Sequence, residues 1–411
     1  MSSKFDVVFV ERYFFPEGWG GAQIPRDITV ELSRAGFRVA VVCGRDQYIR
    51  EEGVDRQDPR DAGVSIWYVP RFRFAKSSSK GIVSQLWFCV TAALTIVLRG
   101  RPMLFIVQTN PPLVVVFLSA ISTILRRRMI LVAQDLYPEV MIAHGILDRE
   151  SLRGRILLSM FRRAYQRAAC VVSLGSGMTA RLLKKGVQGD RIREISNWAT
   201  GDPHIVRGPA NLLVREWGVA GRFVVLYSGN LGVAHDAPTI VRAFAGAKTQ
   251  LARLCLVFVG EGGRIDETRR LVAELGLGNF VLFKPPVPME LLPHALGAAD
   301  LALVTLLPGF EGLVVPSKLL GHMARGVPTM YIGPKSGDIP DLLARSGGGV
   351  SVANGDIETA SALLIELSRN PTIVDRMGAA AAHYYIEHLS RELGLTAYRS
   401  LVQSFILKQP E

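Results

Sequence analysis

Short apolar segments alternate with longer amphipathic segments along most of this chain of 411 residues. In the first half, strand-like segments are predicted at 5–14, 37–44, 64–70, 103–109, 128–135 and 170–176, and helix-like segments such as 22–36 and 154–169 lie between them. The strand segments are mostly continuous apolar runs, which is typical of strands that are buried on both faces of a parallel sheet. This pattern predicts an α/β protein with helices on both faces of its sheets.

The alternation pauses once, at 197–219, where Pro, Gly and Asn are frequent and no strand pattern is visible. It restarts with strand-like segments at 223–230, 253–260, 280–287, 300–307, 327–333 and 349–354, separated by helix-like segments such as 236–248 and 263–276, and helical material follows over 357–408. A hydrophobic content of 49% is enough for two cores. We therefore predict a first domain over 1–197, a linker over 198–219 and a second doubly wound domain over 220–389, with a cleft between the domains.

The charge balance indicates an anionic partner, because the net charge is +12. Nucleic acid, acidic lipid and phosphorylated small molecules all fit this balance. Nucleic acid is disfavoured because no aromatic and basic platform is visible. The four cysteines are far apart in apolar contexts, which predicts buried free thiols in a reducing compartment and no zinc site: Cys43, Cys89, Cys170 and Cys255. The N-terminus has no signal-peptide pattern.

Two apolar segments in the first half raise the question of a membrane. Segment 82–98 is uncharged and close to the ~17-residue lower limit for a spanning helix, whereas 113–125 is too short to span. We expect both to be helices packed in or against the first domain, and insertion of 82–98 stays open. Arginines crowd the same domain: Arg126, Arg127, Arg128, Arg149, Arg153, Arg155, Arg162, Arg163 and Arg167. The combination predicts peripheral association with the cytoplasmic face of an anionic membrane, although a solvated helix face has the same composition.

Glycine-rich turns follow three of the predicted strands. They are PEGWGGAQ (16–23), YSGNLGVAHD (227–236) and FVGEGG (258–263), with Gly20, Gly21, Gly229, Asn230, His235 and Glu261 as their candidate donor-binding residues. Ligands of doubly wound sheets bind beyond the carboxyl ends of the strands, and a helix that starts there presents free N–H groups to an anion. Neither turn of the second domain fits the dinucleotide pattern of G-x-G-x-x-G with a later acid, so a nicotinamide enzyme is disfavoured.

The stretch EGLVVPSKLLGHMARG (311–326) places Ser317 at the expected N-cap of a helix and Lys318 in its first turn. A lysine at this place opposes the helix dipole, which costs stability unless an anion binds there. The alternative is a solvated lysine. We interpret Ser317 and Lys318 as part of an anion site.

Taken together, these stretches resemble a family 4 glycosyltransferase with the GT-B fold, from the branch that builds bacterial surface polysaccharides such as colanic acid and O-antigen. The resemblance rests on GWGGAQIPRDITVELSRAGFRVAVV, QDLYPEVMIAHGIL, SGNLGVAHDAPTIVRAF, VGEGG, EGLVVPSKLLGHMARGVP and GGGVSVANGDIE, which occur in the family's order. It implies two Rossmann-like domains, a nucleotide-sugar donor bound mainly by the second domain, an acceptor bound mainly by the first, and a C-terminal helix over 390–408 that crosses back to the first domain.

The resemblance also implies roles for individual residues. Gly20 and Gly21 match the glycine loop near the donor phosphates, and Asp135 falls near the family's polar residue beside the reacting sugar. Asn230 and His235 stand where many members carry the Arg and Lys that hold the diphosphate. Glu311 is near the first acid of the family's E-x7-E signature, and Asp135 and Glu311 are therefore the catalytic candidates.

The chain departs from the family pattern at several of these positions. Gly321 stands at the second acid's place, and Glu311 lies ten positions before it rather than eight. The Arg and Lys pair is also replaced, and Lys318 and Lys284 are candidates for the missing positive charge.

The expected activity is retaining transfer from a nucleotide sugar to a lipid-linked or saccharide acceptor in surface polysaccharide assembly, with no cofactor and no metal. Two other functions stay open. One is a non-catalytic scaffold subunit, for which the broken signature is the best support. The other is a nucleotide-sugar 2-epimerase, because these enzymes share the GT-B architecture.

Overall fold

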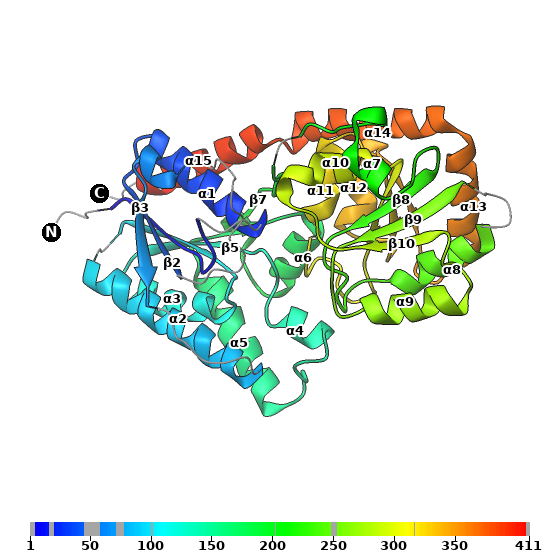
Figure 1. Cartoon of the computed structure of the whole chain (residues 1–411). Coiled ribbons are helices and arrows are strands. Elements are labelled where there is room, and N and C mark those ends of the chain that lie inside the picture. The colour runs from blue at the N-terminus through cyan, green and yellow to red at the C-terminus, as the bar shows by residue number, and fades with distance from the viewer. Residues whose placement is uncertain are drawn as a thin grey trace. The chain divides into compact units, whose positions relative to one another are not determined.

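The computed structural model describes residues 5–15, 20–44, 58–70, 78–99, 102–201, 203–247, 253–315 and 317–407. The chain divides into two compact units (Figure 1). The first unit contains Met1–Asn197, Gly312–Val314 and Arg391–Glu411, and the second contains Trp198–Glu311 and Val315–Ser390.

Among the described residues, the first unit is built on a seven-stranded parallel sheet in the order β3-β2-β1-β4-β5-β6-β7. Its strands are β1 (Val7–Val10), β2 (Val39–Gly44), β3 (Ser65–Val69), β4 (Leu104–Gln108), β5 (Arg128–Val132), β6 (Cys170–Ser173) and β7 (Ile192–Glu194). The six strands predicted from the sequence are all present, and β7 is an additional short edge strand. Because β1, β4, β5 and β6 are buried along their length, they carry no polar alternation.

Helices cover both faces of this sheet. They are α1 (Gly20–Arg34), α2 (Ser78–Arg99), α3 (Leu113–Ile124), α4 (Glu139–Ala143), α5 (Leu152–Arg167), α6 (Ser176–Lys184) and α15 (Arg391–Ile406), with short turns η1 (Pro59–Ala62) and η2 (Gly189–Arg191). The two apolar segments of the sequence form α2 and α3, and α3 packs against both α2 and α5. Over the described ranges, none of the helices combines the length and the hydropathy that a membrane crossing requires.

The C-terminal helix α15 packs on α1 within the first unit, where the red and blue helices lie together in Figure 1. Its Arg391 Nε lies 2.8 Å from Oδ2 of the buried Asp27, and its Arg399 pairs with Glu31 at 2.9 Å. Helix α15 lies within the segment 390–408 expected to cross back, and these ion pairs attach it to the first unit.

The second unit is built on a six-stranded parallel sheet, counted over the described residues, in the order β10-β9-β8-β11-β12-β13. Its strands are β8 (Phe223–Ser228), β9 (Leu254–Val259), β10 (Val281–Lys284), β11 (Leu301–Thr305), β12 (Thr329–Ile332) and β13 (Gly349–Val352). Both sheets are parallel and doubly wound, so the fold class expected from the sequence is confirmed.

The helices of the second unit are α7 (Leu212–Glu216), α8 (Ala237–Ala247), α9 (Ile265–Glu274), α10 (Leu292–Gly297), α11 (Ser317–Ala324), α12 (Asp338–Ser346), α13 (Ile357–Arg369) and α14 (Pro371–His388), with turns η3 (Gly208–Ala210) and η4 (Met289–Leu291). Residues 198–219, which the sequence pattern indicates as a linker, pack as part of this unit. Trp198 is buried, and Leu213, Trp217 and Val219 belong to the hydrophobic core of the second unit. Their burial decides the structure of a segment whose Pro and Gly content is typical of a loop.

The four cysteines are buried and free, as expected: Cys43, Cys89, Cys170 and Cys255.

Candidate functional site

The strand order of the second sheet reverses between β8 and β11, because β9 follows β8 on one side and β11 lies on the other. The carboxyl ends of two such strands form the preferred ligand site of a doubly wound sheet. In this unit β8 ends at Ser228 and β11 at Thr305. The segments that follow these two strands carry most of the donor-binding residues expected from the sequence.

The glycine-rich turns after β8 and β9 interlock through their backbones. Gly229, Gly260 and Gly262 have φ values of +114°, +136° and +143°, which side chains of L-residues rarely adopt. A Cβ atom on Gly260 would lie 2.3 Å from the Gly229 carbonyl oxygen, and one on Gly262 would lie 2.4 Å from that of Leu231. Two hydrogen bonds join the turns, from Leu231 N–H to the Glu261 carbonyl and from Arg264 N–H to the Leu231 carbonyl. These glycines are therefore required for close backbone packing at the strand ends.

Lys318 lies directly beneath the turn after β8. Its Nζ donates to the Tyr227 hydroxyl at 2.6 Å and to the Asn230 carbonyl at 3.2 Å. A Cβ atom on Gly229 would lie only 2.8 Å from the lysine Cε. The glycine thus leaves room for the lysine to reach the switch point from the first turn of α11.

The surroundings of Lys318 disfavour its charged form. Burial lowers the pKa of Lys318 to about 7. An ammonium group has three N–H donors, and two of those of Lys318 have partners among the described residues. One donor remains for a ligand oxygen. A lysine with this pKa and one available donor can respond to an incoming anion by binding both the anion and a proton.

Tyr227 is a candidate site residue that the sequence pattern did not predict. Its ring lies 4.0 Å from Lys318 Nζ, and its hydroxyl donates to the Asn230 carbonyl at 2.8 Å. Burial also raises the pKa of Tyr227, so its hydroxyl stays protonated. Tyr227 occupies one position of an apolar strand, FVVLYS, in which nothing distinguishes it from a core residue. Only its position at the strand end makes it part of the site.

His235 connects the segments after β8 and β11. Its Nδ1 lies 2.8 Å from the Thr305 carbonyl, and since a carbonyl only accepts, Nδ1 carries the proton. The ring also packs edge-on against Tyr227, with 5.7 Å between the ring centroids. The predicted residue therefore lies at the switch point, where it supports Tyr227 and β11.

Asp236 occupies the N-terminus of α8. Its buried carboxylate accepts from Thr239 N–H and from the Thr239 hydroxyl, and Asn354 Nδ2 donates to it at 2.8 Å. Since a carboxylate already satisfies this helix start, α8 is a poor site for an anionic ligand.

Helix α11 begins at Ser317, so this residue is the first of the helix rather than its N-cap as expected. The preceding residue, Pro316, lies outside the described ranges. Ser317 is exposed, and N–H groups in the first turn of a helix have no partners within the helix. Together with Lys318, this start offers the positive end of a helix dipole to an anion.

Three other predicted residues of this unit lie outside the immediate surroundings of Lys318. Lys284 ends the edge strand β10, and its carbonyl holds Gly260 N–H at 3.0 Å. Glu261 is exposed on the turn after β9. Glu311 accepts from Gly309 N–H at 2.7 Å and lies near Gly337. In the described part of the chain no hydrogen bond or ion pair connects Lys284 with Lys318, Asn230 or His235.

In the first unit, Asp135 follows β5 at the carboxyl edge of the sheet. Its N–H and that of Gln134 donate to the Thr109 hydroxyl after β4, and its backbone pairs with Val314. Burial raises the pKa of Asp135 to about 6. The next helix, α4, starts four residues later behind Pro138, so Asp135 is not its N-cap. Its carboxyl group is therefore not explained by a role in helix capping.

Gly20 and Gly21 are the first two residues of α1, which follows β1 in the same sheet. The preceding part of their predicted loop, 16–19, lies outside the described residues.

A second acid that the sequence reasoning did not select stands at the end of β1. Glu11 is 2% exposed, and burial raises its pKa to about 8. One carboxyl oxygen accepts from Tyr13 N–H, and Oε2 has no partner among the described residues. Gln108 ends the neighbouring strand β4, and its Nε2 is also buried without a partner in the described ranges. Glu11 is therefore a protonated, hydrogen-bond-competent group at the switch point of the first sheet.

Two family models match this chain. A glycosyl transferase 4-like domain matches residues 20–198, and the glycosyl transferases group 1 domain matches residues 215–384. The chain is 27% identical over 305 residues to the probable glycosyltransferase WbjE of Pseudomonas aeruginosa, a match that covers 72% of this chain and 75% of that protein.

A second relative is the GDP-mannose-dependent alpha-(1-6)-phosphatidylinositol monomannoside mannosyltransferase of Mycolicibacterium smegmatis. It is 24% identical over 232 residues, which cover 56% of this chain and 57% of the relative.

Among solved structures, Anabaena HepE in complex with UDP-glucose has the same fold. The TM-score is 0.70 at 14% identity, and the match covers 98% of this chain and 100% of the other. Both halves of the chain are thus matched by glycosyltransferase models, and the fold is that of solved GT-B glycosyltransferases. The chain therefore belongs to the glycosyltransferases that combine a glycosyl transferase 4-like domain with a glycosyl transferases group 1 domain.

Proposed function

We propose that this enzyme is a retaining glycosyltransferase that moves a sugar from a nucleotide-sugar donor to a lipid-linked saccharide in the assembly of a cell-surface polysaccharide. The observation that carries the proposal is the position of Lys318, which reaches the switch point of the second sheet beneath the Gly229 turn. The relatives support this donor class. HepE is named in complex with UDP-glucose, and the Mycolicibacterium relative is named for GDP-mannose.

The proposed role of this end of the sheet is stabilisation of the leaving diphosphate. Cleavage of the bond between sugar and phosphate increases the negative charge on the phosphate oxygens in the transition state. Lys318 and the first-turn N–H groups of α11 supply hydrogen-bond donors to that charge. Because these groups are positioned before the reaction, they need little reorganisation when the charge develops.

We assign Asp135 to the sugar or the acceptor rather than to the phosphates. In a front-face transfer with retention no protein nucleophile is required, so its carboxyl group would orient or polarise a hydroxyl. Asp135 lies at the carboxyl edge of the first sheet, with its backbone held by Thr109 and Val314. A pKa of about 6 leaves it ionised at neutral pH, as a hydrogen-bond acceptor for a hydroxyl.

The lipid-linked acceptor follows from the surface of the first unit and from the Mycolicibacterium relative, whose name gives a phosphatidylinositol monomannoside as the acceptor. Helix α2 exposes Val83, Trp87, Val90 and Leu94, which recur at helical spacing on one face. Helix α5 exposes five arginines: Arg153, Arg155, Arg162, Arg163 and Arg167. Apolar and basic side chains in one layer fit the cytoplasmic surface of an anionic membrane, and the proposed location is therefore peripheral to it.

Metal independence is part of the same proposal. A lysine and a helix N-terminus at the diphosphate stabilise the negative charge for which other transferases use a divalent cation. A chelator should therefore leave transfer unchanged.

Calorimetric titration of the purified protein with UDP, GDP and dTDP tests the donor site. We expect at least one to bind, and Lys318→Ala to weaken it by ~1–3 kcal/mol, or roughly 5- to 150-fold, the scale of a charge-assisted hydrogen bond. Lys184→Ala, an exposed lysine on α6 of the first unit, is the matched control. Equal affinity in Lys318→Ala and the wild type would refute the assignment. Binding without transfer to any acceptor would favour the scaffold function.

A further inference from the structure

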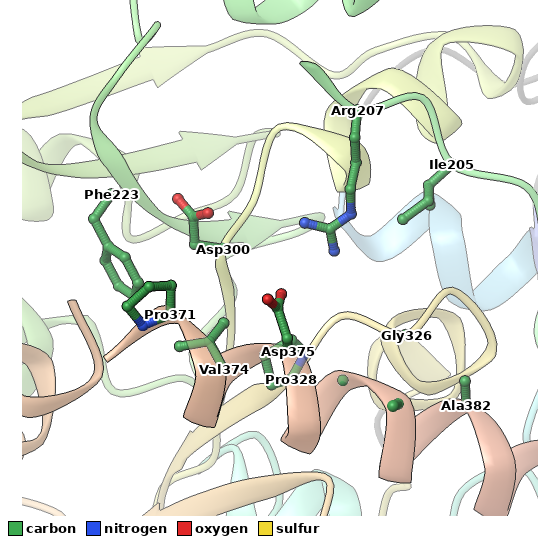
Figure 2. Close-up of a pocket in the computed structure, with 12 residues that line it drawn as sticks. Ile205, Arg207, Phe223, Asp300, Gly326, Pro328, Pro371, Val374, Asp375 and Ala382 are labelled. Atoms are coloured by element: carbon green, nitrogen blue, oxygen red, sulfur yellow. The ribbon is translucent and has the colours of Figure 1, made fainter. Parts of the chain in front are cut away.

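A pocket of about 320 Å³ opens at the other end of the second sheet, where the strands begin (Figure 2). Phe223 is the first residue of β8, Asp300 directly precedes β11, and Pro328 directly precedes β12. The switch point with Lys318 lies at the opposite, carboxyl ends of the same strands. The pocket and the proposed donor site therefore lie at opposite ends of the strands of this sheet.

Besides these strand starts, two further segments form the pocket. Helix α14 contributes one face with residues at helical spacing, namely Pro371, Val374, Asp375, Gly378, Ala379 and Ala382, and its small residues leave the space open. The extended segment before η3 contributes Ile205 and Arg207. Val206 between them is held by a hydrogen bond from its N–H to the Pro293 carbonyl, and both of its neighbours line the pocket.

Three charged side chains converge on this space. Figure 2 shows the guanidinium of Arg207 and the carboxylate of Asp375 pointing toward one another from different elements, with the Asp300 carboxylate beside them on the wall of the pocket. Burial has the largest effect on the pKa of Asp300 and raises it, the hydrogen bond from Val224 N–H and the charge of Arg207 lower it, and the charge of Asp375 raises it. The charges therefore act on one another. Oδ2 of Asp300 accepts from Val224 N–H at 2.7 Å. In the described structure none of the three side chains forms an ion pair within 4.0 Å, so the second oxygen of Asp300, the Arg207 guanidinium and the Asp375 carboxylate keep hydrogen-bonding capacity for a ligand.

This set of groups restricts the ligand. Among the described residues no group of three or more His, Cys, Asp or Glu side chains could hold a metal ion, and the two carboxylates repel an inorganic anion. A hydroxyl group can donate to a carboxylate and accept from a guanidinium at the same time. Phe223, Pro371, Val374 and Ile205 supply apolar walls for the C–H face of a ring. The volume is at the lower end of the roughly 300–1,000 Å³ that small-molecule pockets have.

We propose that this pocket is a second carbohydrate site, which binds one pyranose unit of a neutral saccharide through Arg207, Asp300 and Asp375. A saccharide held there keeps its chain attached to the enzyme between encounters with the transfer site, which raises the local concentration of acceptor. The affinity for a single sugar is in the millimolar range, because the pocket is shallow enough to leave Arg207 and Asp375 exposed to water.

Saturation-transfer NMR on the full-length protein tests this site. The probes are D-glucose, D-galactose, D-mannose and N-acetyl-D-glucosamine, each at millimolar concentration with saturating UDP. We expect saturation transfer to at least one sugar. Ala379→Phe, which fills the pocket from an exposed position of α14, should reduce the signal at least fivefold, and Asp375→Asn should reduce it as well.

Two control variants separate this site from the rest of the protein. Arg376→Ala changes an exposed residue of α14 that does not line the pocket, and Lys318→Ala changes the proposed donor site. Both should keep the saturation transfer. The proposal is overturned by the absence of signal with all four sugars, by a signal that persists in Ala379→Phe, or by a signal lost in Lys318→Ala instead. Failure of nucleotide binding in calorimetry would refute the donor site, and Ala379→Phe and Asp375→Asn would still decide whether a sugar binds in this pocket.

Discussion

Lys318 combines a buried position with a place at the start of a helix, and both disfavour its positive charge. The free energy that this costs is recovered when an anion binds, because the bound anion favours the charged form. Hydrogen bonds to the Tyr227 hydroxyl and to the Asn230 carbonyl hold the lysine in place, so its ammonium group is already positioned before a ligand binds. A residue that is destabilised before binding and stabilised after it is typical of a ligand site.

The lowered pKa of Lys318 predicts that the protein takes up a proton when it binds a nucleotide. Because the pKa of Lys318 is about 7 without ligand, most of this group is neutral at pH 8, and a bound diphosphate raises its pKa. Affinity for UDP or GDP should therefore fall as the pH rises above 7. Calorimetry at pH 8 in two buffers with different ionisation enthalpies measures the uptake, which should approach one proton. The same uptake in Lys318→Ala would contradict this origin.

We expect a substitution at Asp135 to affect turnover and not nucleotide binding. Asp135→Asn should lower kcat by about 100-fold, the scale found when one preorganised polar group is removed from an active site, and leave nucleotide affinity within twofold. Since burial raises the pKa of Asp135 to about 6 in the free enzyme, wild-type kcat/KM should fall as the pH drops through 6, and the variant should lack this limb. Asp190→Asn, at an exposed acid of the first unit, is the control. An equal loss of nucleotide affinity would disprove the separation of roles.

At the scale of elements, the site depends on two strand-to-helix turns that touch through their backbones. The turn after β8 carries Asn230 and lies over Lys318, and the turn after β9 packs on it from the side. Their contact leaves no space for a Cβ atom at Gly260. The glycines of FVGEGG therefore serve the geometry of the neighbouring turn, and direct ligand contact is not needed to explain them.

Gly260→Ala should destabilise the second unit by roughly 2–3 kcal/mol or more, because it adds a strained φ to an overlap with the Gly229 carbonyl. Gly263→Ala is the matched control in the same turn, since a Cβ atom there meets nothing within 4 Å and its φ is unexceptional. Denaturant unfolding measures both free energies. Equal stability of the two variants would mean that the turns can separate at little cost.

At the scale of the whole molecule, the net charge of +12 is distributed unevenly, and α5 of the first unit carries a group of exposed arginines. The outward face of α2 in the same unit is apolar. The inward face of α2 is also apolar and packs Phe88, Cys89, Ala92 and Ile96 into the core. This explains why the sequence shows an uncharged segment of nearly spanning length in a helix that belongs to a folded unit.

Binding to vesicles that contain phosphatidylglycerol should fall at least tenfold between 0.1 and 1 M salt, because the Debye length falls from ~10 to ~3 Å. Leu94→Glu on α2 should weaken binding at low salt, since it places a charge on the apolar face. Leu183→Glu, at an exposed leucine of α6, is the control. Sedimentation with vesicles measures all three proteins. Binding that is insensitive to both salt and Leu94→Glu would exclude this surface.

The sequence by itself determined the two parallel sheets, because strands such as VVFV and LCLVFV are apolar at every position and each is followed by an amphipathic helix. It also located the glycine-rich turns and Lys318, since glycine clusters at strand ends and a lysine in a first helical turn are local features. It did not reveal that 198–219 packs into the second unit, because the burial of Trp198 and Trp217 depends on partners that are distant in sequence.

Only the tertiary structure decided what surrounds each functional side chain. Tyr227 supports Lys318 across 91 positions of sequence, and Asn354 reaches Asp236 across 118. Glu11 and Gln108 stand at the ends of two strands, β1 and β4, that only the fold makes neighbours in the sheet. Arg207, Asp300 and Asp375 face one pocket although each belongs to a different segment. Local patterns report periodicity and backbone freedom, whereas pKa shifts, hydrogen-bond partners and cavities depend on long-range packing, which no local pattern encodes.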